Sequence, residues 1–152
     1  MNRRIVSILT ITLTLLSLAS CSSSKANALR ITNGILLPCP SSPNCVSSQA
    51  EDAKHKIDPI AFPISKKTVI HSIIIKALND LGRVEIITNT PDHIHAIFKT
   101  KFFKFKDDLD LYIDQTNNRI QVRSASRTGY SDLGVNRKRI EALRNIIVKT
   151  DV

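Results

Sequence analysis

A short segment near the carboxyl end of the chain concentrates side chains that could bind an anion. It offers hydroxyl, guanidinium, carboxylate and amide groups, at Ser124, Ser126, Arg127, Asp132, Asn136 and Arg137. An expected helix begins here, and the N-terminus of a helix adds free amide donors and a partial positive charge, which suit a carboxylate or phosphate. The same residues could instead be structural, with Asp132 or Asn136 capping the helix and Arg127 pairing with an acidic residue. We favour the structural interpretation, and the sequence leaves both open.

Serine and histidine residues give weaker indications of catalysis. No Gly-x-Ser-x-Gly turn surrounds Ser124, Ser126 or Ser131, so a nucleophile with its base is not recognisable. His93 and His95 place two imidazoles on one face of an expected strand, as some metal sites do, but no third ligand can be identified. We expect a solvated histidine pair, no catalytic residue, no bound metal and no cofactor.

The amino-terminal segment is typical of a secretory leader. A cationic start, Met1–Arg4, precedes the apolar stretch Ile5–Leu18. As a helix this stretch is about 21 Å long, which is too short for a hydrocarbon core of about 30 Å. The following residues, Leu18–Cys21, resemble the lipobox of bacterial lipoproteins, in which the cysteine is acylated with chains such as palmitate. We therefore expect a lipoprotein signal peptide over residues 1–20 and a membrane anchor on Cys21.

The net charge and the residues after Cys21 indicate where the mature chain would be anchored and how its domain would be linked to the anchor. The 152 residues carry a net charge of +9, which falls to +7 once Arg3 and Arg4 are removed with the leader. Residue 22 is Ser and not Asp, which by resemblance to the sorting rule of diderm lipoproteins favours the outer membrane, facing the periplasm. Residues 21–30 lack an apolar period and are predicted to be a flexible tether before a domain over 31–152. Export argues against a nucleic-acid partner.

Cys39 and Cys45 are predicted to form a disulfide. In an exported chain two thiols separated by five residues are expected to be oxidised to each other. Redox centres and zinc knuckles typically use two intervening residues, so the spacing disfavours both.

Hydrophobic periodicity after residue 62 predicts the elements of the domain. Residues 65–81 show a helical period, with Ser65 as a possible N-cap and Gly82 as the stop. Apolar and polar residues then alternate over 84–88, 94–100, 108–114 and 119–123, and residues 135–148 are amphipathic with helical spacing. The order predicts an α+β domain: an antiparallel four-stranded sheet with two helices packed on one face, preceded by an irregular disulfide-containing segment over 31–62.

The register of the last hairpin can be predicted from its charges. Pairing Ile113 with Ile120 places Asp110 opposite Arg123, and a slip of one residue would turn the apolar side chains into water. Residues 99–106 alternate Lys with Phe, and we expect the Phe side chains in the core and the Lys side chains in water. An anionic lipid or envelope polymer is the other possible explanation of these lysines.

Three segments carry a resemblance to a known family: residues 37–49 (LPCPSSPNCVSSQ), 103–114 (FKFKDDLDLYID) and 122–139 (VRSASRTGYSDLGVNRKR). They resemble the DUF1499 family of bacterial and plant proteins over most of residues 35–148. The resemblance implies that the cysteine loop and the segment 124–137 belong to one domain, and it implies no reaction.

Together these features predict a lipid-anchored cell-envelope protein that is a non-catalytic binding, assembly or envelope-maintenance module. Its partners would be the membrane, through the anchor, and an anionic lipid, an envelope polymer or an envelope protein. The alternative is an envelope hydrolase or transferase acting on an anionic lipid or glycan-linked substrate, centred on Ser126, Arg127, Asp132 and Arg137.

Overall fold

The computed structural model describes residues 30–100 and 105–150. The expected signal peptide, Cys21 and residues 21–29 of the expected tether lie outside the described residues, as do residues 101–104 of the lysine- and phenylalanine-rich segment. Within the described residues, no helix is both long and apolar enough to cross a membrane.

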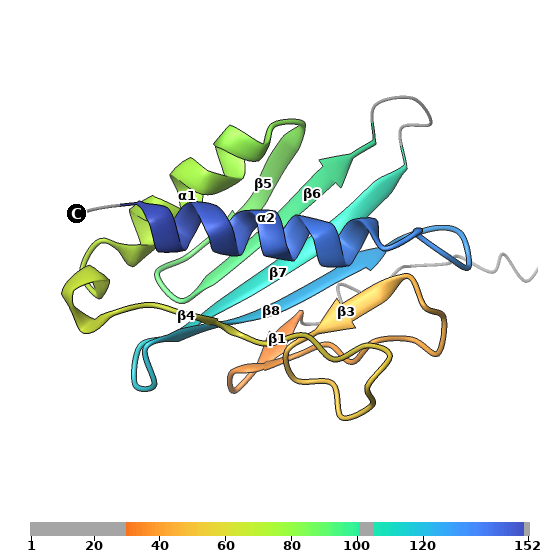
Figure 1. Ribbon diagram of the computed structural model, residues 1–152, viewed down its shortest axis with the longest axis horizontal. Helices are drawn as coiled ribbons and strands as arrows, with labels where there is room; N and C mark the ends of the chain where they lie inside the picture. Colours follow the sequence, from red (N-terminus) through yellow and green to blue (C-terminus); the bar gives the residue numbers. More distant parts are fainter. Residues whose placement is uncertain (1–29, 101–104, 151–152) are drawn as a thin grey trace, which may run out of the picture.

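The described chain forms a mixed α and β domain (Figure 1). Its elements in chain order are β1 (Ile31–Thr32), β2 (Ile35–Leu36), β3 (Cys45–Ser47), β4 (Ile60–Ala61), the 3₁₀ turn η1 (Ile64–Lys66), α1 (Ile70–Leu81), β5 (Val84–Asn89), β6 (His93–Lys99), β7 (Lys106–Asp114), β8 (Arg119–Ser126) and α2 (Val135–Lys149).

The main sheet has six strands and not the expected four. Its order is β3-β8-β7-β6-β5, with β4 also pairing with β8, and every pair is antiparallel. The prediction missed β3 and β4 because strands of three and two residues are too short to show alternation. Both form by pairing with the edge of β8, so the segment 31–62 is less irregular than expected, and β1 and β2 form a further hairpin within it.

The predicted register of the last hairpin is confirmed. Ile113 pairs with Ile120, Leu111 with Val122 and Asp110 with Arg123. The alternation of β7 and β8 therefore places one set of side chains under the helices and the other set on the opposite face of the sheet.

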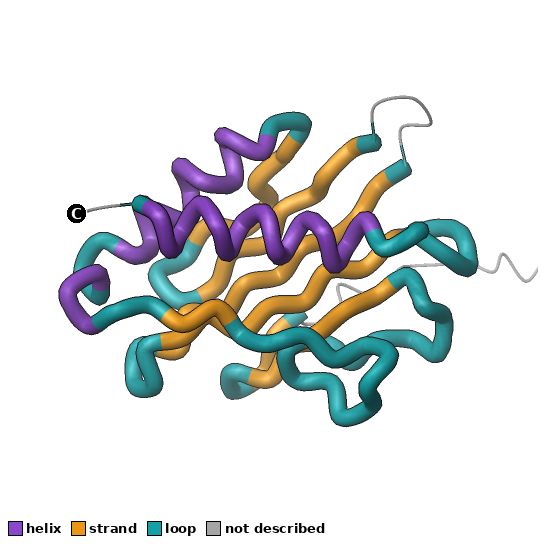
Figure 2. The backbone as a smooth tube through the Cα atoms, viewed as in Figure 1, coloured by secondary structure: helices purple, strands orange, loops and turns teal. Residues whose placement is uncertain are grey.

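Both helices cover the same face of the sheet (Figure 2). From α1 the buried side chains include Ile70, Ile74 and Leu78, and from α2 Ile140, Leu143 and Ile147. They pack on the apolar residues of β6, β7 and β8 in one core. Burying each such side chain contributes about 1.5–3 kcal/mol, so this layer holds the sheet and the start of α2 in a fixed relation.

The start of α1 differs from the expectation. The helix begins at Ile70 and not after a Ser65 cap, because residues 64–66 form the 3₁₀ turn. The buried Lys66 in this turn directs its ammonium to the carbonyl oxygens of Ile147 and Val148, both at 3.2 Å, and so caps the end of α2. The predicted stop is confirmed, since Gly82 follows the helix with φ of 70°.

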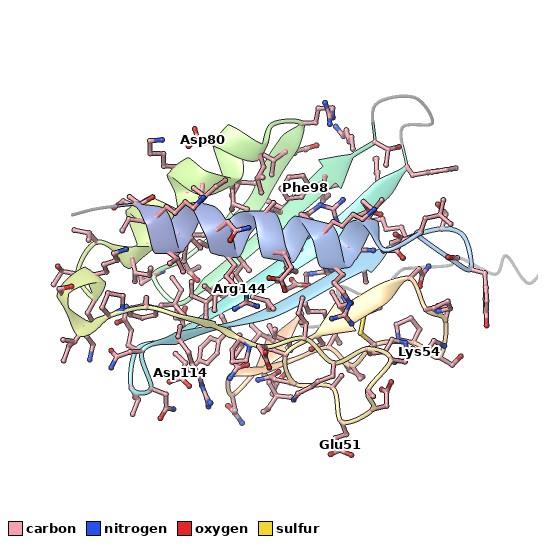
Figure 3. The ribbon with its side chains drawn as sticks, viewed as in Figure 1. Glu51, Lys54, Asp80, Phe98, Asp114 and Arg144 are labelled. Atoms are coloured by element: carbon pink, nitrogen blue, oxygen red, sulfur yellow. A yellow bond between two sulfur atoms is a disulfide. The ribbon has the colours of Figure 1, made fainter. Side chains whose placement is uncertain are left out.

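The segment before α1 is fastened to the rest of the domain by a covalent bond and by side chains. The predicted disulfide between Cys39 and Cys45 is present and closes a loop that leads into β3. From α2, the guanidinium of Arg144 donates to the carbonyl oxygens of Asp58 and Pro59 (Figure 3). These contacts hold the segment along one edge of the sheet.

Candidate functional site

The alternation of β8 divides the predicted anion-binding residues between the two faces of the sheet. Ser124 and Ser126 share the helix-covered face with Val122, whereas Arg127 follows Arg123 and Ala125 on the opposite side. The structure therefore does not bring the six predicted residues into one group. It places them in two polar clusters and one loop, and each has different partners.

The first group, which we call the Asn136 cluster, lies between the sheet and the start of α2. It consists of Asn44, Asp107, Ser124, Ser126, Asn136 and Arg139.

The side chain of Asn136 is the centre of this cluster. It is fully buried, and its amide nitrogen donates to the carbonyl oxygen of Asn44 and to Oγ of Ser126, both at 3.0 Å. Its amide oxygen accepts from Oγ of Ser124 at 2.6 Å and from the guanidinium of Arg139 at 2.6 Å. All the hydrogen-bonding capacity of this amide is used inside the protein.

A single ion pair completes the Asn136 cluster. Arg139 donates to Asp107 at 2.6 Å, and Oγ of Ser126 donates to the other carboxylate oxygen at 2.6 Å. The guanidinium also lies over the ring of Phe98, 4.7 Å from its centre. Sequence reasoning missed Asn44, Asp107 and Arg139 as members. The one available signal was strand alternation: Asp107 has the same parity as the apolar residues Leu109, Leu111 and Ile113 of β7, so its carboxylate faces the core with them.

Asp132 and Arg137 have structural partners at the entry to α2. The carboxylate of Asp132 accepts from the backbone N–H of Gly134 at 3.0 Å and of Asn136 at 2.8 Å, so it caps the helix as the structural interpretation predicted. Arg137 donates to the carbonyl oxygens of Lys54 and Lys56. Both residues are thus bonded to backbone groups that fix the loop around the helix start.

The second group, which we call the Asp110 cluster, lies on the face of the sheet away from the helices. It consists of Arg30, His93, His95, Asp108, Asp110, Arg123 and Arg127.

Arg30 joins the chain entering the domain to this cluster. Its guanidinium donates to both carboxylate oxygens of Asp110, at 2.6 and 2.7 Å, and lies 3.5 Å from Asp108. Asp110 is fully buried, and Arg123 lies 3.7 Å from it on the other side. Asp108 accepts two hydrogen bonds from Arg127, each of 2.9 Å. Two carboxylates thus face three guanidinium groups.

The histidine pair is not solvated, which corrects the expectation. His93 and His95 do lie on one face of β6, but both are buried against the acidic residues of β7. Nε2 of His95 is 2.7 Å from Asp108, and Nε2 of His93 is 3.5 Å from Asp110. In the described parts of the chain, no group of three or more His, Cys, Asp or Glu residues is arranged to hold a metal ion.

The pKa values of both carboxyl groups follow from these partners. Burial alone would raise the pKa of Asp108, but hydrogen bonds from His95 and Arg127 and the charge of Arg30 lower it well below its ordinary value. Burial would likewise raise the pKa of Asp110, and the neighbouring His93 and Arg30 reverse the effect. Both groups are therefore carboxylates near neutral pH, and neither is suited to act there as a general acid.

A pocket opens beside the Asn136 cluster, where β6 ends and α2 begins. It has a volume of about 250 Å³ and includes the side chains of Arg83, Lys99, Arg139, Phe98, Val135 and Leu81. Its walls thus combine three cations with apolar surface, and no Asp or Glu lines it. An anionic group attached to an apolar body suits such a surface, and sequence reasoning found only Lys99 among its cations.

The comparisons with known proteins give a family and no activity. A protein-family model described as "Protein of unknown function (DUF1499)" matches residues 35–147. This range includes the disulfide, all the strands of the main sheet and nearly all of both helices. No curated protein matches the chain significantly.

Proposed function

We propose that this chain, which belongs to the DUF1499 family, is a non-catalytic binding module held at the cell envelope by a lipid on Cys21. The observation that carries the proposal is that the polar side chains which catalysis would need are already hydrogen-bonded to one another within the protein. The hydroxyls of Ser124 and Ser126 donate to Asn136 and Asp107, and both His95 and Arg127 bond to Asp108.

Catalysis by these serines would need a nucleophile that a substrate can reach and a base beside it. Ser124 is fully buried beneath α2, and its hydroxyl also accepts a hydrogen bond from Arg139. The imidazoles of His93 and His95 lie on the opposite face of the sheet, so the sheet itself separates them from Ser124 and Ser126. The Asn136 and Asp110 clusters are suited to holding the neighbouring loops in fixed positions.

The anchor is supported by the Leu18–Cys21 sequence and by the way in which the chain enters the domain. Arg30, nine residues after Cys21, is clamped by Asp110. Because only a short segment separates Cys21 from Arg30, an anchor on Cys21 would hold the sheet close to the membrane. Cys21→Ser is expected to abolish acyl labelling and to leave the precursor uncleaved. Normal maturation and labelling of this variant would refute the anchor.

The non-catalytic part of the proposal has its own test. The intact chain is incubated with a fluorophosphonate that reacts with activated serines, and its mass is measured, with a known serine hydrolase as the positive control. We expect no adduct on this chain. An adduct on Ser124 or Ser126 that disappears on substitution by Ala would overturn the proposal and support an envelope hydrolase instead.

A further inference from the structure

One end of the domain exposes apolar and basic side chains together. At this end β6 finishes, β7 begins, and β8 leads into α2 (Figure 1). Lys99 pairs with Lys106, the backbone of Lys99 bonds to that of Arg83, and the backbone of Arg127 bonds to that of Lys106. We call this surface the basic end. It consists of Arg83, Lys99, Phe105, Lys106, Arg127, Tyr130, Leu133, Val135 and Lys138.

The apolar residues of the basic end are held out into solvent. Leu133 is 86% exposed, Tyr130 74% and Phe105 51%. The loop that carries Tyr130 and Leu133 is fixed at both ends, because the Asn44 side chain donates to the carbonyl oxygen of Gly129 and Asp132 caps α2. Exposing a large apolar side chain forgoes the free energy that its burial would contribute. Tyr130 and Leu133, held exposed on a fixed loop, therefore indicate a surface that contacts another phase or partner.

The charge of this surface is positive. Arg83, Lys106 and Lys138 form no ion pair with any other described residue. Four nearby acidic groups pair with cations: Asp107 with Arg139, Asp108 with Arg127, Asp80 with Lys76 and Glu85 with Lys99. Asp132, in the loop with Tyr130 and Leu133, instead accepts backbone N–H bonds. An anionic surface is the complement of this pattern.

The pocket at the same end provides a place for a single anionic group. Arg83 contributes positive charge to it, whereas Lys99 and Arg139, which also line it, already pair with Glu85 and Asp107. Val135 and Phe98 contribute apolar wall. A phospholipid offers the matching chemistry, with a phosphate in the headgroup and an apolar body behind it. A nucleotide would match the charge, and its base could stack on an aromatic ring, but it would leave the exposed Leu133 without a partner.

We propose that the basic end docks on an anionic phospholipid bilayer, with Tyr130, Leu133 and Phe105 entering the interface and a headgroup phosphate in the pocket of Arg83, Lys99 and Arg139. This inference rests on the proposed anchor. The nine residues from Cys21 to Arg30 span at most about 32 Å, and Arg30 bonds to residues only two and four positions from Lys106. The anchor would therefore keep the basic end within reach of the lipid.

The test uses the full acylated protein in vesicles of phosphatidylcholine, with or without phosphatidylglycerol. Hydrogen exchange of the backbone amides of residues 127–135 is compared between the two lipids. We expect slower exchange when phosphatidylglycerol is present and a loss of this protection at high salt, since the charges then are screened. Arg83→Glu is expected to reduce the protection by a factor of about five or more, the change that each basic residue near an anionic surface contributes.

Variants at the other end of the domain provide matched controls. The Tyr130→Ser, Leu133→Ser double variant is expected to lose the protection, whereas Ile64→Ser removes an equally exposed apolar residue, at 74%, and should keep it. Lys67→Glu, at an exposed position beside η1, should also keep it.

The outcomes separate failure of the docking from failure of the anchor. Protein that does not remain with vesicles after sedimentation refutes the anchor. Protein that remains with the vesicles but shows the same exchange in both lipids refutes the docking alone. Protection that appears in intact envelopes and never in vesicles also refutes docking on lipid, and it would direct attention to an envelope protein or polymer.

Discussion

The buried carboxylates on the two faces of strand β7 have different kinds of partners. On the helix-covered face, Asp107 meets one guanidinium, and amide and hydroxyl groups of the Asn136 cluster satisfy the remaining atoms. On the other face, Asp108 and Asp110 meet three guanidinium groups and two imidazoles. The first cluster is mostly neutral and lies beneath α2, with Ser126 and Arg139 half-buried, whereas the second is highly charged and includes the exposed Arg127.

The two clusters hold different parts of the chain in place. The Asn136 cluster joins β8, α2 and the loop before β3, and so holds the loop with Tyr130 and Leu133 in place. The Asp110 cluster joins the central strands to Arg30, where the chain enters the domain. A buried charge is stable only when its partners are present, so the second cluster depends more strongly on each of its members.

Asp110→Ala is expected to have the largest effect. It leaves Arg30 and Arg123 without their buried carboxylate, and removing one member of a buried ion pair costs about 3–5 kcal/mol in the free energy of unfolding. Urea unfolding followed by circular dichroism measures this. The control is Asp80→Ala, which removes an exposed pair with Lys76 and should cost under about 0.5 kcal/mol. Equal losses in the two variants would contradict the central role of Asp110.

Asn136→Ala tests the neutral cluster and is expected to cost about 2–3 kcal/mol, because the buried Asn44 and Ser124 lose hydrogen bonds that water cannot replace. The amides of residues 127–135 should also exchange faster. Asn145→Ala, at an exposed position of the same helix, is the control and should be neutral or slightly stabilising. Unchanged exchange in Asn136→Ala would show that the cluster does not position the loop.

Acid should weaken the Asp110 cluster. The pKa values of Asp108 and Asp110 are lower in the folded chain than in the unfolded chain. Their contribution to stability is therefore complete above about pH 3.9, the ordinary pKa of Asp, and is lost as the pH falls further. Urea unfolding over this pH range should show that the free energy of unfolding falls less for Asp108→Asn than for the unmodified chain. Asn136→Ala should retain the full slope, and a reduced slope there would contradict the assignment.

Arg127→Ala is expected to have the smallest effect on stability, about 0.2–1 kcal/mol, because this guanidinium is partly exposed and Asp108 keeps its contacts with His95 and Arg30. Thermal unfolding is the measurement, with Arg127→Lys as the variant that retains charge. A loss as large as that of Asp110→Ala would show that Arg127 is an essential member of the cluster.

The elements with strong local patterns were predictable. The alternation of residues 108–123 and the opposite charges of Asp110 and Arg123 were sufficient for the register of the β7–β8 hairpin. The helical period identified the second helix almost to its ends. The strands β3 and β4 could not be predicted in the same way, because they exist only through the edge that β8 offers them.

The partners of the polar residues were much less predictable. Alternation placed His93 and His95 on one face, but their burial depends on acidic residues of the neighbouring strand. Asp132 could be recognised as a helix cap because its partners lie within four residues. Asn44 and Asn136 are 92 residues apart, and no local pattern relates them.

The sequence by itself determined the helices, the longer strands, the register of the β7–β8 hairpin and the cysteine pair, because each depends on residues close together in the chain or on a regular period. Only the tertiary structure decided that one polar segment is divided between two faces, that Arg30 bonds to Asp110 across a separation of 80 residues, and that Arg83 joins Lys99 beside an exposed apolar loop. The physical reason is that hydrogen bonds and ion pairs act over a few ångströms, and only folding brings these distant residues within that range.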